Sequence, residues 1–232
     1  MPERIQPLGV KAPLRILVVV ASPRSLPALD VPAEWARLND ALGQQVAQGA
    51  VQLERLEPAT LNGLQSQLRQ GSYHVLHFIG HGEFDGEARM GQLWLEEADG
   101  EGRAVSAEQL GMLLHDHDSL RVCVLNACEG GRSAIADPFA GTAQTLVQQG
   151  IPAVAAMQFR ISDTAAIALA REFYAALVVG YPVDAALAEA RKAVFAQGNN
   201  IEWGTPVLYM RSPDGRVFDT EEERMSPDKE QG

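Results

Sequence analysis

The amino-acid sequence predicts a three-layer α/β/α fold built on a mostly parallel sheet of about six strands. Short apolar segments, rich in Val, Ile and Leu, alternate along the chain with longer segments whose apolar residues recur at helical spacing. Strands that alternate with helices are typical of a parallel sheet covered on both faces. Residues 122–125 are Val-Cys-Val-Leu, an uninterrupted apolar run of the kind found in a strand buried on both faces.

The expected strands are apolar runs bounded by turn-forming residues. They lie at residues 14–20, 51–56, 73–80, 122–125, 153–157 and 205–210, with a small hairpin that joins residues 91–96 to 104–105. The run at 51–56 alternates between apolar and polar residues, which favours a half-exposed strand at the edge of the sheet. Five apolar residues should therefore share one sheet: Val18, Leu76, Val124, Ala155 and Val207.

Helix boundaries are indicated by capping residues and by the glycines and prolines that end or open a helix. Apolar residues at helical spacing predict helices at 32–46, 61–70, 107–115, 138–149, 163–179 and 182–195. Ser106 and Gln109 form a capping-box sequence before the third helix, and Ser162 precedes the fifth. Residues 1–13 are expected to form an N-terminal arm, 14–212 one domain, and 213–232 a disordered acidic tail.

Composition and charge exclude several classes of function. The 232 residues carry a formal net charge of -11, from 19 basic and 30 acidic residues, which argues against a nucleic-acid or anionic-membrane surface. Only two cysteines occur, both in one strand region, so no disulfide framework is expected and a reducing compartment is favoured. No apolar run approaches the length of a membrane span, and no signal peptide opens the sequence. We therefore expect a cytoplasmic protein.

A cysteine and a histidine lie where two of the expected strands end. Cys128 follows the strand at 122–125 after Asn-Ala and precedes Glu-Gly-Gly, and His81 follows the strand at 73–80 between two glycines. The carboxyl ends of parallel strands meet at one edge of a sheet, where ligands bind in open α/β folds. A histidine within reach of a cysteine can act as the base that activates a thiol nucleophile.

Each of these residues also has an inert alternative. A free cysteine is more often a small buried hydrophobic residue, and a loop histidine can simply bond a carbonyl. Cys123 lies in the middle of an apolar strand, so we expect an inert core residue, because burial in apolar surroundings raises the pKa of a thiol. His77 precedes His81 by four residues, a spacing that brings two rings to one metal only in a helix. We therefore expect a core histidine and no metal site.

Two segments together match the pattern of a known family. They are His-Phe-Ile-Gly-His-Gly at 77–82 and Leu-Asn-Ala-Cys at 125–128, and they resemble the CHAT domain, a caspase-like branch of the cysteine peptidase clan that includes caspases and separase. Further segments look like the first loop and the later segments of the family: residues 21–27, residues 157–163, Phe173, Tyr174 and residues 203–209. The resemblance therefore extends over residues 14–211.

The resemblance implies a caspase-like α/β/α fold and a cysteine endopeptidase with His81 as general base and Cys128 as nucleophile. The thiolate then attacks a peptide carbonyl to give an acyl-enzyme that water hydrolyses. The backbone N–H groups of Gly82 and Cys128 are the expected oxyanion donors, since a glycine at position 82 allows close approach. No third member of a triad can be read from the sequence, so we expect a backbone carbonyl to orient His81.

Three charged residues are candidates for the pocket that receives P1, the substrate residue before the cleaved bond. Asp163 follows the fifth expected strand, in a region where separase-like relatives use an acidic residue to receive a basic P1 side chain. We expect Asp163 at the base of this pocket, and its alternative role is in the N-terminal cap of the helix that starts there. Arg24 and Arg160 compete, because an arginine in the pocket favours an acidic P1 residue or neutralises the carboxylate.

The function that follows is a caspase-like endopeptidase that acts on a protein or peptide substrate without a cofactor or metal. It is either active on its own or latent until a regulatory protein partner activates it. The alternative is a catalytically silent interaction module, in which the same cleft holds a partner without cleaving it. Reaction of Cys128 with a peptidyl electrophile separates the two.

Overall fold

The computed structural model describes residues 5–85, 90–127, 139–159, 161–198 and 201–220, and its centre is a six-stranded sheet of order β10-β9-β8-β4-β2-β3. The strands are β2 (Leu14–Val20), β3 (Val51–Arg55), β4 (Val75–Gly80), β8 (Val122–Ala127), β9 (Ala153–Met157) and β10 (Pro206–Met210). All neighbours pair in parallel except β10, which is antiparallel to β9. The predicted sheet is confirmed, with β3 at its edge.

Residues along each strand pack alternately against the two faces of the sheet. In β2, Ile16 and Val18 belong to one buried apolar cluster, whereas Leu17 and Val19 belong to the other. Side chains on a strand point to opposite faces in turn, so a strand that is apolar at every position has both faces buried. This explains why the central strands are continuous apolar runs in the sequence.

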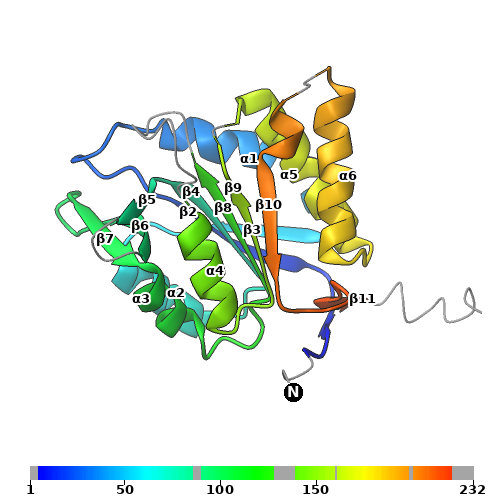
Figure 1. Ribbon diagram of the computed structural model, residues 1–232, viewed down its shortest axis with the longest axis horizontal. Coiled ribbons are helices and arrows are strands. Elements are labelled where there is room, and N and C mark those ends of the chain that lie inside the picture. The colour runs from blue at the N-terminus through cyan, green and yellow to red at the C-terminus, as the bar shows by residue number, and fades with distance from the viewer. Residues whose placement is uncertain (1–4, 86–89, 128–138, 160, 199–200, 221–232) are drawn as a thin grey trace, which may run out of the picture.

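Three helices cover each face of the sheet (Figure 1). One face carries α1 (Val31–Ala47), α5 (Asp163–Val178) and α6 (Val183–Ala196). The other carries α2 (Leu61–Gln70), α3 (Ala107–Leu114) and α4 (Ala140–Gln148). The predicted capping box of Ser106 and Gln109 is present at the start of α3. A short 3-10 helix, η1 (Glu202–Gly204), precedes β10.

Two small sheets complete the fold. The antiparallel sheet β5-β6-β7 consists of β5 (Gly82–Asp85), β6 (Met90–Glu96) and β7 (Gly102–Ser106), and it extends the hairpin expected from the sequence. Strands β1 (Leu8–Val10) and β11 (Phe218–Thr220) pair in parallel, and they lie in the ranges expected as the arm and the tail. Residues 221–232 of the expected tail lie outside the described residues.

Candidate active site

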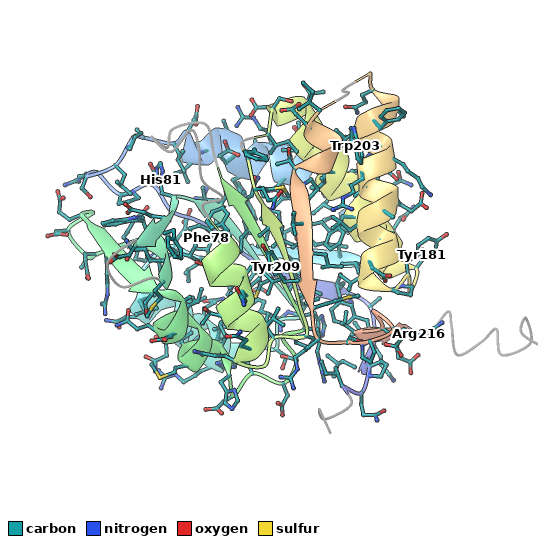
Figure 2. All side chains as sticks on the ribbon, in the orientation of Figure 1. Phe78, His81, Tyr181, Trp203, Tyr209 and Arg216 are labelled. Atoms are coloured by element: carbon teal, nitrogen blue, oxygen red, sulfur yellow. The ribbon has the colours of Figure 1, made fainter. Side chains whose placement is uncertain are left out.

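His81 is the first residue after β4 and is buried, with 7% of its surface exposed. Figure 2 shows it at the end of the sheet opposite to Arg216. Its Nε2 atom lies 2.9 Å from the carbonyl oxygen of Pro27. A carbonyl can only accept, so in the neutral ring Nε2 donates its proton and Nδ1 is left unprotonated and able to accept one. The backbone carbonyl expected to orient this histidine is therefore that of Pro27.

Hydrogen bonds from the loop that follows β2 hold Pro27 in position. The N–H group of Ala21 donates to the carbonyl of Ile79 in β4 at 3.0 Å. The N–H group of Ser22 donates to a carboxylate oxygen of Glu96 in β6, also at 3.0 Å. The loop is thus attached to the strand that carries the histidine and to the small sheet beside it, which fixes the carbonyl that orients the ring.

The same loop directs Arg24 toward the turn between β6 and β7. Its N–H group donates to the carbonyl of Gly100 at 2.9 Å, and its Nη1 donates to the carbonyl of Asp99 at 3.1 Å. Gly100 has a φ of +83, and a Cβ atom there would lie 3.1 Å from Nε of Arg24. The turn and the guanidinium group therefore pack closely, and the structure does not bring Arg24 to Asp163.

Strands β4 and β8 end at the same level of the sheet. Gly80, the last residue of β4, is the register partner of Ala127, the last residue of β8. His81 and Cys128 are the next residues in the sequence, and Cys128 lies outside the described residues. His81 and the end of β8 therefore meet at one point on the carboxyl edge of the sheet.

Backbone pairing directs the N–H group of Gly82 away from β6. The N–H group of Trp94 donates to the carbonyl of His81 at 3.0 Å, and Gly82 lies opposite Leu93 in the same register. In an antiparallel pair, residues that exchange hydrogen bonds with the partner strand alternate with residues whose N–H and C=O groups point outward. His81 is of the first kind, so Gly82 is of the second, and the expected oxyanion donor faces outward beside the histidine.

A cavity lies between α1 and α5 on one face of the sheet, near the strand ends. Asn126 of β8, His77 of β4 and Tyr174 of α5 are among its lining residues, and its volume is about 40 Å³. That volume holds a few water molecules. The Oδ1 atom of Asn126 is buried without a hydrogen-bond partner among the described residues. A buried acceptor without a hydrogen bond lowers the stability of the fold by about 1–3 kcal/mol. This oxygen is therefore available to a donor that enters the cavity.

Asp163, which the sequence analysis expects at the base of the P1 pocket, is among the residues that line this cavity, at its exposed rim. It is the first residue of α5, directly after the N-cap Ser162, and 54% of its side chain is exposed. Its Oδ2 atom lies 2.8 Å from Nη2 of Arg37 in α1. A carboxylate in the first turn of a helix is favoured by the helix dipole.

The sequence analysis missed Arg37 as the cation that pairs with Asp163. Arg37 is also held by Glu34, one helical turn before it, at 2.8 Å between Nη1 and Oε1. Its pairing with Asp163 depends on the packing of α1 against α5, for which no local pattern in the sequence gives a signal. Arg160, expected as a competing cation, lies outside the described residues.

Burial makes two titratable residues beside the site chemically inert. Desolvation lowers the pKa of His77 to about 4, and its Nδ1 lies 2.6 Å from the hydroxyl of Tyr174. Desolvation likewise raises the pKa of the Cys123 thiol to about 12. Both residues are core residues, as the sequence analysis expected.

The described part of the chain shows neither a metal-binding cluster nor a membrane-spanning helix. No group of three or more His, Cys, Asp or Glu side chains there is arranged to hold a metal ion. Within the same residues, no helix is both long enough and apolar enough to cross a membrane.

Comparisons with known proteins agree with this architecture. The fold is similar to that of pro-sf-caspase-1, with a TM-score of 0.52 and 12% identity over 89% of this chain and 94% of that chain. It is also similar to the Saccharomyces cerevisiae separase-securin complex, with a TM-score of 0.50 and 17% identity over 88% of this chain but only 12% of that chain. The chain therefore has a caspase-like fold.

The family follows from the sequence. The model of the CHAT domain matches residues 3–212, and the chain belongs to the CHAT domain family. A search of curated proteins gave no match.

Proposed function

We propose that the chain is a cysteine endopeptidase in which His81 is the general base and Cys128 the nucleophile. The observation that carries this proposal is the pairing of Gly80 with Ala127 at the ends of β4 and β8. Neighbouring strands lie ~4.8 Å apart and consecutive Cα atoms ~3.8 Å apart. A residue that directly follows β8 therefore starts within side-chain reach of one that directly follows β4, which supports a Cys-His pair.

The chemistry uses the orientation of the histidine ring. Nδ1 of His81 takes the proton of the Cys128 thiol, because Nε2 donates to the carbonyl of Pro27. The thiolate attacks the carbonyl carbon of the substrate, and the oxyanion accepts hydrogen bonds from the N–H groups of Gly82 and Cys128, with removal of one such donor costing ~3 kcal/mol. The C–N bond then breaks, the imidazolium gives its proton to the leaving amine, and water hydrolyses the acyl-enzyme.

Asp163 is the residue that we propose to select lysine or arginine at P1, and its pairing with Arg37 means that a basic side chain has to displace that cation. A basic P1 side chain replaces Arg37 as the partner of Asp163 and forms a charge-assisted hydrogen bond with its carboxylate. The P1 cation then binds at the rim of the cavity, where Asp163 is among the lining residues. Substrate binding by Arg24 or Arg160 stays a prediction. To reach the cavity rim, the Arg24 side chain needs to give up its hydrogen bond to the Asp99 carbonyl.

A catalytically silent module is the second candidate function. In that case the cleft beside His81 holds a segment of a partner protein without cleaving it. The separase neighbour was solved in complex with securin, which supports control of the present chain by a separate protein.

We place this activity in the cytoplasm, because the sequence has two cysteines and neither Cys123 nor its surroundings indicate a disulfide.

Two cysteine variants test the proposal against loss of stability. Cys128→Ala should abolish cleavage of fluorogenic peptides with arginine, leucine or aspartate at P1, whereas Cys123→Ala should leave it largely intact. Equal loss in both variants would mean that stability, and not the nucleophile, has been changed. In the same assay Asp163→Ala should lower kcat/KM after arginine by about threefold, because an exposed charge pair is worth at most ~1 kcal/mol, and leave cleavage after leucine unchanged.

A further inference from the structure

No described strand pairs with the outer edge of β5, which lies directly beside His81. β5 is the edge strand of the sheet β5-β6-β7, and its only strand partner among the described residues is β6. Because Gly82 faces outward, Phe84 two residues later faces outward as well. Within the described residues, no backbone hydrogen bond outside the β5–β6 ladder involves the N–H or C=O groups of either residue. Two donors and two acceptors therefore line this edge, and the first donor is the expected oxyanion donor.

The small sheet and the Asp163 cavity lie on opposite sides of His81. The cavity lies between α1 and α5, whose residues form the apolar cluster on one face of the main sheet. Leu93 and Leu95 of β6 belong to the cluster on the other face, with α2, α3 and α4. A polypeptide with its P1 side chain at the cavity rim and its scissile bond at His81 therefore continues toward β5.

We propose that the free edge of β5 binds the substrate segment that follows the cleaved bond, as an added parallel strand. This inference rests on the proposed function. The register follows from the oxyanion contact, because Gly82 N–H bonds the P1 carbonyl oxygen. In a parallel ladder the P2′ N–H group then donates to the carbonyl of Gly82, Phe84 N–H donates to the P2′ carbonyl, and the P4′ N–H group donates to the carbonyl of Phe84.

Side chains at this edge fit an extended peptide. Gly82 has no side chain, so the peptide backbone can approach closely next to the histidine. The Phe84 side chain is 49% exposed and lies on the same face as the P3′ side chain in this register. The edge therefore binds P2′ and P4′ through the backbone and favours an apolar residue at P3′.

Peptides methylated on single backbone nitrogens test the register. The probes are octapeptides with arginine, leucine or aspartate at P1 and mixed residues elsewhere, with an N-methyl group at P2′ or at P3′. The P2′ N–H group is bonded in the proposed register, whereas the P3′ N–H group points away from β5. Methylation at P2′ should lower kcat/KM about fivefold, as expected for one lost hydrogen bond, and methylation at P3′ should not. Equal effects at both positions, or no effect at either, would overturn the proposal.

Two variants of Phe84 separate the backbone donor from the side chain. Phe84→Pro removes an outward N–H group without removing a bond to β6, and edge strands tolerate proline at such positions. It should lower kcat/KM for octapeptides about fivefold and leave peptides that end in a small fluorogenic amide unaffected. Phe84→Ala keeps the N–H group and should weaken only substrates with an apolar P3′ residue. If both variants act alike on all substrates, the edge does not pair with the peptide.

Binding to the Cys128→Ala variant distinguishes failure of this inference from failure of the proposed function. The affinity of fluorescein-labelled octapeptides for this variant is measured by anisotropy, with the same N-methyl series. Weaker binding of the P2′-methylated peptide alone supports strand addition, even if the wild-type chain cleaves no peptide. Absence of binding, or binding that is insensitive to methylation at P2′, overturns it.

Discussion

His77 and His81 belong to the same strand segment, four residues apart, yet their surroundings give them opposite properties. His77 lies inside β4, where only 4% of its surface is exposed, and burial lowers its pKa to about 4. Its ring is held by the hydroxyl of Tyr174. His81 lies just past the end of the strand, where one ring nitrogen bonds the carbonyl of Pro27 and the other has no partner among the described residues.

The two cysteines follow the same rule on the neighbouring strand. Cys123 is inside β8 and its thiol pKa is raised to about 12 by burial, so almost no thiolate exists at neutral pH. Cys128 follows the last residue of β8 in the sequence. In β4 and β8 the histidine and the cysteine inside the strands are thus buried and inert, whereas the positions that follow both strands lie at the carboxyl edge, where ligands bind in α/β folds.

The largest expected effect is on catalysis. It is tested by comparing a variant of His81 with a variant of His115, a histidine at the other edge of the sheet. His81→Ala should lower kcat about 10³-fold, the usual contribution of a general base, at temperatures below the melting point of the variant. His115→Ala is the control, because His115 is an exposed residue that directly follows α3 and bonds the Gln149 carbonyl. Peptide hydrolysis and thermal melting of both variants check the prediction. A comparable loss of kcat in both variants would contradict it.

The second effect is on stability and concerns His77. Its pKa is about 4 when folded and ~6.5 when unfolded, so the unfolded chain binds a proton first as the pH falls. The stability held by neutral His77 is therefore complete above pH ~6.5 and decreases as the pH falls toward 4, by about 3 kcal/mol in total. Urea unfolding of wild type and His77→Gln from pH 8 to pH 4 measures this. If the difference between the two chains does not change with pH, His77 is not the group that titrates.

The smallest effect concerns the ion pair at the cavity rim. Arg37→Gln removes the cation that competes with a basic P1 side chain for Asp163. We expect KM for arginine substrates to fall about threefold, because an exposed pair is worth at most ~1 kcal/mol, while KM for leucine substrates stays the same. Steady-state kinetics with matched peptides check this. An equal change for both substrates would show that Arg37 acts through the packing of α1 and not through Asp163.

Local patterns in the sequence were sufficient for the sheet but not for the site. Apolar runs predicted all six strands of the main sheet, and the Ser106 capping box predicted the start of α3. Strand β5 was missed because Gly-Glu-Phe-Asp has neither an apolar run nor a strong β preference, and it forms only by pairing with β6. The pairing of Arg37 with Asp163 joins two helices that are distant in the sequence, so no periodicity could reveal it.

The central claim is that the end of β8 provides a nucleophile activated by His81, and covalent labelling tests it most directly. The full-length chain is treated with a peptidyl acyloxymethyl ketone that has arginine at P1, and the modified cysteine is located by mass spectrometry. The account predicts a single adduct on Cys128, unchanged by Cys123→Ala and strongly reduced by His81→Ala. An adduct on Cys123, or labelling of Cys128 at the same rate without His81, would contradict it.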